Sequence, residues 1–225
     1  DGITYYVAWR KLQPSLSNSP NFTPIDRVIS AAKAHGKTVR IGVYAGRWSP
    51  ANLQCNNGSG TSACTKCTDP NKSSTFNFTT PDNKVFTSPV PWDPIYLVKF
   101  QQFVQQFGQK YDAEPTITYV AITGPSINTG AEATLPLNKA EEISCLTDTF
   151  GFTRTIFLNA WKSMIDSYDS AFPHKDLVLA LHPWVLTDRN SEISLDIASY
   201  AKQRLASRFL LFPHQSRSQS HAIFC

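Results

Sequence analysis

The sequence has no long hydrophobic run and no cluster of basic residues. Its longest apolar stretches, at residues 177–181 and 209–212, fall far short of the roughly 20 residues that a membrane-spanning helix needs. Lysine and arginine are scattered, and the formal net charge is only +4 over 225 residues. We therefore expect neither a membrane span nor a nucleic-acid partner.

Motifs for several common chemistries are also absent. No glycine-rich phosphate-binding sequence occurs, and residues 9–14 follow the first strand-like segment where a nucleotide-binding fold has a glycine-rich turn. No Gly-x-Ser-x-Gly nucleophile motif occurs. Cys64 and Cys67 form one Cys-x-x-Cys pair, but Cys55 is the only other thiol nearby and their loop contains no histidine. Because a zinc site needs four ligands, we expect disulfides rather than a metal, and no cofactor.

Cysteines and glycosylation sequons fall together in polar stretches. The cysteines in such stretches are Cys55, Cys64, Cys67 and Cys145. The Asn-x-Ser/Thr acceptor sites are Asn21, Asn57, Asn71 and Asn77. Three of the four sequons lie between residues 55 and 80, in the same loop as three of the cysteines. This clustering indicates an oxidising secretory route, so we expect an extracellular protein with disulfides at these cysteines and glycans at these asparagines.

The number of cysteines and the first residues add two expectations. Five cysteines leave at least one unpaired or bonded outside the chain, and Cys225 is the natural candidate for an intermolecular contact or disulfide. The chain opens at Asp1 in strand-like sequence with no visible signal peptide, so we expect a mature form or a fragment.

Strand-like and helix-like segments alternate along the chain. The strand-like segments are residues 2–9, 37–46, 117–124, 177–184 and 209–213. The helical apolar spacing recurs after residue 23 and in residues 94–111, 153–168 and 193–205. This alternation predicts one α/β domain over residues 1–225, with parallel strands joined by right-handed crossovers. An open doubly wound sheet and a TIM-type (β/α) barrel both fit, and the missing glycine-rich turn favours the barrel, which five strands leave incomplete.

Residues 47–94 interrupt this rhythm. The segment is rich in Asn, Ser, Thr, Pro and Cys, and it is too long for an ordinary strand-to-helix connection. We expect it to form a glycosylated, disulfide-bearing excursion from the rim of the barrel, and call it the excursion. Trp48 and Trp92 flank it, and both a sugar platform and simple packing anchors fit their positions.

Chemically useful side chains gather where the strands end. In barrels of this type the active site lies at the carboxyl ends of the strands. The polar and aromatic residues there are Trp9, Arg10, Tyr44, Arg47, Trp48, Thr123, Asn128, Glu132, His182, Trp184, His214 and Gln215. The candidates for substrate binding are Trp9, Arg47, Trp48, Asn128, His182, Trp184 and His214. Such residue types stack on sugar rings and bind hydroxyls, although a strand-end Trp or His also serves as an ordinary packing residue.

Several short motifs in the first part of the chain resemble a known group. They are Trp-Arg-Lys-Leu-Gln-Pro (9–14), Ile-Asp (25–26), Ala-Ala-Lys-Ala-His-Gly-Lys (31–37), the strand at 39–46, Val-Pro-Trp-Asp-Pro (90–94), Ile-Thr-Gly-Pro (122–125) and Gly-Ala-Glu (130–132). Over about residues 2–135 the chain resembles the barrel of clan-A-type glycoside hydrolases of the β-galactosidase or cellulase kind. In that group W-x-x-L-E-P followed by D-x-x-I-x-x-A-x-x-x-G-K marks the second strand and its helix, and strand four carries the acid/base glutamate.

The resemblance implies a catalytic role for Glu132. It makes residues 117–124 the fourth strand and Glu132 the general acid/base. The group's Asn-Glu pair at the end of strand four is absent, since Thr123-Gly124 stands there and Glu132 follows eight residues later. A solvated loop carboxylate is the alternative interpretation of Glu132.

The same register leaves the second carboxylate of a hydrolase unassigned. In the resembled barrels the nucleophile follows strand seven, which this chain does not reach. The nearest downstream carboxylates, Asp188 and Glu192, follow strand five. Two hypotheses result: a secreted glycoside-hydrolase-like protein that acts on or binds carbohydrate, or a non-catalytic carbohydrate-binding or structural glycoprotein on a degenerate hydrolase barrel.

Overall fold

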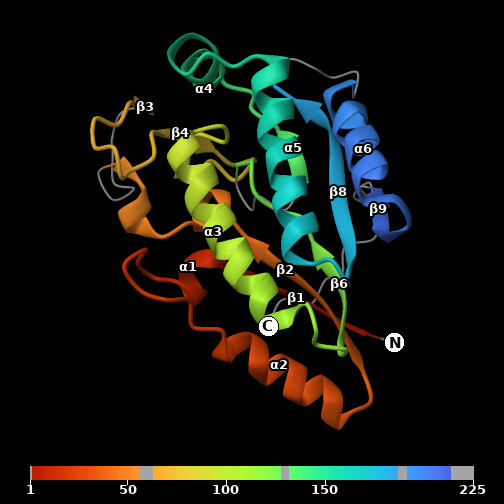
Figure 1. Ribbon diagram of the computed structural model, residues 1–225. Helices are drawn as coiled ribbons and strands as arrows, with labels where there is room; N and C mark the ends of the chain where they lie inside the picture. The colour runs from red at the N-terminus through yellow and green to blue at the C-terminus, as the bar shows by residue number, and fades with distance from the viewer. Residues whose placement is uncertain (1, 56–62, 128–131, 187–191, 214–225) are drawn as a thin grey trace.

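In a computed structural model, the chain is built around a parallel β-sheet (Figure 1). The structure describes residues 2–55, 63–127, 132–186 and 192–213. Within these residues the sheet has six strands, and every pairing between them is parallel. The strands are β1 (Gly2–Ala8), β2 (Thr38–Tyr44), β6 (Ile117–Ala121), β7 (Glu132–Leu135), β8 (Asp176–Val185) and β9 (Phe209–Pro213). The predicted α/β class with a parallel sheet is confirmed.

The strands cross the sheet in chain order. β1, β2, β6, β8 and β9 are successive neighbours, and β7 continues beyond β6 along the same side of β8. An order without reversal is typical of the wall of a (β/α) barrel, whereas a doubly wound sheet reverses at its switch point. Across the described residues, β1 and β9 each pair on one side only, so this part of the chain forms a sheet with two edges.

Helices pack on one face of the sheet. The longer ones are α2 (Thr23–Ala34), α3 (Pro94–Tyr111), α5 (Arg154–Ala171) and α6 (Glu192–Leu205). The Asp93 carboxylate accepts hydrogen bonds from the first N–H groups of α3, and the Thr153 hydroxyl does the same for α5. Figure 1 shows α3 and α5 lying side by side in front of the strands, with α6 beside β8.

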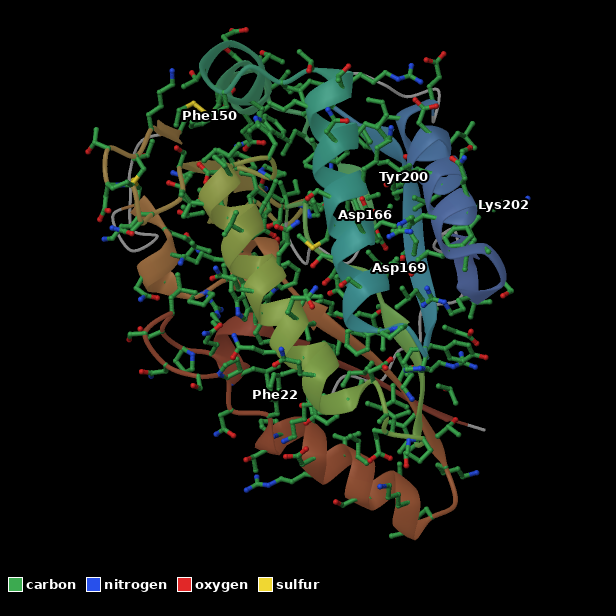
Figure 2. The ribbon with its side chains drawn as sticks, viewed as in Figure 1. Phe22, Phe150, Asp166, Asp169, Tyr200 and Lys202 are labelled. Carbon is green, nitrogen blue, oxygen red and sulfur yellow. A yellow bond between two sulfur atoms is a disulfide. The ribbon has the colours of Figure 1, made fainter. Side chains whose placement is uncertain are left out.

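Polar contacts fix α6 against α5. The hydroxyl of Tyr200 donates to the carboxylate of Asp166 at 2.9 Å, and Arg204 forms ion pairs with Asp166 and Asp169. Figure 2 shows Asp166 and Asp169 on the side of α5 that faces Tyr200. These contacts fix the orientation of α6, which packs against β8 and β9.

The hydrophobic core fills the space between sheet and helices. Alternate residues of β2, Val39, Ile41 and Val43, are buried in the same cluster as Phe100 and Phe107 of α3. Strand geometry places Arg40, Gly42 and Tyr44 on the opposite face. The two faces of the sheet therefore differ, one apolar and covered by helices, the other polar and aromatic.

The excursion forms a small antiparallel sheet of its own. Its strands are β3 (Cys64–Thr65), β4 (Thr75–Thr79) and β5 (Val85–Pro89). One disulfide joins Cys55 to Cys67, and a second joins Cys64 to Cys145, beyond β7. All four cysteines expected in disulfides are therefore paired, and the second bond ties the excursion to the segment that follows α4 (Ala140–Ser144).

The predicted glycosylation sites differ in exposure. Asn21 and Asn71 are exposed. Asn77 is half-buried in β4, where its side-chain oxygen accepts a hydrogen bond from Thr87 at 2.8 Å. Asn57 lies outside the described residues, as does Cys225. The exposed positions of Asn21 and Asn71 leave room for a glycan.

Candidate functional site

Two tyrosines stack on the face of the sheet that the helices leave open, within the electrostatic influence of Glu132. Tyr6 of β1 and Tyr44 of β2 stack with ring centroids 4.9 Å apart and planes 17° from parallel. Tyr6 pairs in register with Gly42, and a Cβ at Gly42 would lie 2.2 Å from the Tyr6 ring. Gly42 therefore lets the Tyr6 ring lie across β2 toward Tyr44.

The charge of Glu132 acts on both phenols. Burial raises the pKa of Tyr6 to about 12, and the neighbouring Tyr44 and Glu132 add to this effect. Burial likewise raises the pKa of Tyr44, again with a contribution from the Glu132 carboxylate. Both phenols stay protonated at neutral pH, so each offers an O–H donor within the electrostatic influence of the Glu132 carboxylate. We call Tyr6, Tyr44 and Glu132 the edge cluster.

The pairing of β7 with β8 determines the position of Glu132. β7 pairs with the second half of β8, which aligns Glu132 with Ala180. The residues expected in a loop thus form a short strand instead, and Glu132 is half-buried in it. The interpretation of Glu132 as a solvated loop carboxylate is wrong, because the residue is part of the sheet.

His182 and Trp184 stand near the carboxyl end of β8 and are half-buried. The backbone N–H of Trp184 donates to His182 Nδ1 at 3.3 Å, and its indole N–H donates to the carbonyl of Leu186 at 2.9 Å. The hydroxyl of Thr134 in β7 donates to the carbonyl of Trp184. The Thr134 bond joins β7 to β8, and the two bonds of Trp184 fix its position at the end of β8.

Two strand-end candidates are structural. Trp9 is fully buried, its ring packs on Phe100 and Phe103, and its indole N–H donates to Gln13 at 2.9 Å. It presents no surface to a ligand. Thr123 is also fully buried, and its hydroxyl bonds the carbonyl of Val43 at 2.7 Å, which fastens the end of β6 to β2.

Arg47 and Trp48 line a cavity of about 420 Å³ where the excursion begins, and no residue of the edge cluster is in its wall. Its wall is formed by Arg10, Arg47, Trp48, Ser49, Ala51, Gln54, Val85, Phe86 and Thr87. These residues come from α1 (Trp9–Leu12), from two short 3-10 turns after β2, and from β5. We call this space the Arg47 cavity.

The two tryptophans that flank the excursion have different roles. Trp92 is buried, packs on Phe152 and donates from its indole nitrogen to the carbonyl of Phe150 at 2.9 Å. It is an anchor. Trp48 is half-buried in the wall of the Arg47 cavity, where a ligand can reach it.

Some residues of both sites carry no clear signal in the sequence. Tyr6 lies inside a strand rather than at its end, and only the alternation of β1 points to its face. Gln54 and Phe86 belong to the excursion, where no regular spacing marks them. Asn128 and His214 lie outside the described residues, so their predicted roles stay predictions.

The described part of the chain holds no group of three or more His, Cys, Asp or Glu side chains placed to bind a metal. In that same part, no helix is both long and apolar enough to cross a membrane.

Comparison with known proteins gives only distant structural likeness. No protein-family model matches the chain, and no curated protein does. A β-galactosidase from Rahnella sp. R3 superposes with a TM-score of 0.49 at 12% identity, over 88% of this chain and 33% of that one. A β-galactosidase from the psychrophilic Marinomonas ef1 gives 0.42 at 10% identity, over 80% and 37%.

A morphinone reductase gives a TM-score of 0.43 at 11% identity, over 88% of this chain and 62% of the reductase. The chain thus spans about a third of the length of the two β-galactosidases. Likeness at this level carries no information on activity.

Proposed function

We propose that the chain is a glycoside-hydrolase-like protein that binds carbohydrate at the carboxyl edge of its sheet, with Glu132 as general acid/base. The edge cluster is the observation that carries this proposal. It combines two stacked phenolic donors on the open face of the sheet with a carboxylate whose charge acts on both of them. Hydroxyl groups of a sugar are suited to such a mixture of donors and acceptors.

The strand order supports a barrel as the scaffold. Successive strands are added at one edge of the sheet, and the helices cover one face. Within the described residues, β1 and β9 each pair on one side only, so each has an edge at which a further strand could pair. In a closed barrel the edge cluster would face the mouth, where the active sites of such folds lie.

A non-catalytic sugar-binding protein is the second candidate, and one observation favours it. Hydrolysis of a glycosidic bond needs a second carboxylate across the scissile bond. Glu192, one of two downstream candidates, is instead exposed and ion-paired with Arg154 at 2.7 Å. The other, Asp188, lies outside the described residues.

Secretion is part of the proposal. Two disulfides close the excursion, and such bonds persist in oxidising compartments. The exposed sequons Asn21 and Asn71 fit the same route. We further propose that carbohydrate reaches the edge cluster between the excursion and the end of β8, where His182 and Trp184 are half-buried.

Hydrolysis of a panel of aryl glycosides tests the catalytic claim. We expect Glu132→Gln to lower the rate by at least about 100-fold, because a positioned acid/base contributes roughly 10²–10⁴-fold. Glu141→Gln, a matched change of an exposed glutamate in α4, should leave the rate unchanged. Equal background rates for all three proteins would reject catalysis, and saccharide binding by the wild type would then support the second candidate.

A further inference from the structure

The Arg47 cavity concentrates unpartnered polar atoms. Six buried side-chain nitrogen or oxygen atoms have no hydrogen-bond partner in the part of the chain that the structure describes, and four belong to residues of this wall. They are Arg47 Nε, Arg47 Nη1, Trp48 Nε1 and Gln54 Oε1. Buried polar groups are normally paired, because each unpaired group costs about 1–3 kcal/mol. Their concentration at one cavity points to a ligand that pairs them.

The cavity is positively charged. The Arg47 guanidinium lies 3.8 Å from the Phe86 ring centroid and 4.8 Å from that of Trp48, and the Arg10 guanidinium lies 4.5 Å from Trp48. Burial lowers the pKa of Arg47, and the nearby positive charge of Arg10 lowers it further. Asp82 opposes this effect, but its carboxylate is exposed and paired with Lys84 at 2.7 Å. An anion bound by the two guanidiniums would offset their positive charge.

The residues of the cavity wall also indicate which chemical groups the ligand carries. Stacked guanidiniums keep their in-plane N–H donors for planar oxyanions such as carboxylate, and sulfate is bound in the same way. Gln54 is only 4% exposed and presents an unpartnered acceptor, which calls for a hydroxyl or other donor on the ligand. Trp48 and Phe86 offer aromatic surface for a ring. The volume of about 420 Å³ is within the range of small-molecule sites, roughly 300–1,000 Å³.

We propose that the Arg47 cavity binds an acidic saccharide through a carboxylate or sulfate group held by Arg10 and Arg47. This inference rests on the proposed function in taking carbohydrate as the ligand, and it names the class of sugar. Arg47 comes three residues after Tyr44, the last residue of β2 and a member of the edge cluster. The cavity is therefore a subsite at the same edge of the sheet, beside the excursion.

Calorimetric titration of the full chain tests the inference. The probes are a glucuronic acid oligosaccharide, the matching neutral glucose oligosaccharide, a glucose sulfate ester and inorganic sulfate. We expect at least one acidic sugar to bind at least about tenfold more tightly than the neutral one, because charge-assisted hydrogen bonds differ from neutral ones by about that factor. The tighter of the two acidic probes identifies the group that the arginines hold.

Arg10→Gln is the decisive variant, since Arg10 is exposed and its replacement should not disturb the core. It should weaken binding of the acidic sugar about tenfold or more. Arg27→Gln, an equal charge change on the exposed side of α2, should leave the affinity within about twofold.

Three results would overturn the inference: equal binding of neutral and acidic sugars, an equal loss in both arginine variants, or inorganic sulfate binding as tightly as the better sugar. Glu132→Gln is measured in parallel. Failure of the proposed function appears there as unchanged hydrolysis, whereas failure of this inference appears as a loss of charge preference.

Discussion

At the scale of single residues, neighbouring side chains of a strand lie on opposite faces of the sheet and have different roles. Val43 is fully buried under the helices, while Tyr44 beside it faces the open side and stacks on Tyr6. Gly42 pairs with Tyr6 across the two strands, and a glycine is required there because any side chain would occupy the space of the Tyr6 ring. The stacking of Tyr6 on Tyr44 thus depends on this glycine.

The raised pKa of Tyr6 makes stability depend on pH in the alkaline range. The folded protein holds the phenolic proton up to about pH 12, whereas an unfolded tyrosine loses it near 10. This contribution, about 2–3 kcal/mol, is fully present below pH 10 and is lost as the pH rises toward 12. Tyr6→Phe should therefore show a shallower fall in the free energy of unfolding between pH 10 and 12, measured by denaturant titration. Parallel curves for the two proteins would contradict the placement of Tyr6.

At the scale of helices and strands, much was predictable from periodicity. The apolar spacing in residues 94–111 matches α3, and the strand at 209–213 matches β9. β7 has no recognisable sequence signal, because four residues carry too little pattern and the strand forms through pairing with β8. The acid/base role of Glu132 is therefore predicted only from a family resemblance. The stacking of Tyr6 on Tyr44 could be recognised only once β1 and β2 are placed side by side.

The contact between α3 and α5 depends on one glycine. A Cβ at Gly108 would lie 2.1 Å from the carbonyl oxygen of Ala171. Gly108→Ala should lower the free energy of unfolding by about 1–3 kcal/mol through overpacking, although alanine favours a helix by about 1 kcal/mol. Gln109→Ala, at an exposed position of the same helix, is the control and should be neutral or slightly stabilising. A Gly108→Ala protein at least as stable as the wild type would show that the helices are farther apart.

At the scale of the whole molecule, the excursion and the sheet form one structure. Phe76 and Phe78 of β4 belong to the same hydrophobic cluster as the sheet, and the Cys64–Cys145 bond spans 81 residues. The sequence indicated which cysteines form disulfides, but the pairing could not be read from it, since four cysteines allow three connectivities. The Arg47 cavity escaped prediction for the same reason, because Arg10, Gln54 and Phe86 meet only after the excursion folds back on the end of β2.

The central claim is that the carboxyl edge of the sheet binds carbohydrate. Nuclear magnetic resonance of the labelled chain during saccharide titration tests it most directly. The account predicts saturable shifts at Tyr6, Tyr44 and Glu132, together with Arg47 when the sugar is acidic, and none at the amino ends of the strands. Shifts confined to another surface, or none at all with any neutral or acidic sugar up to ~10 mM, would contradict it.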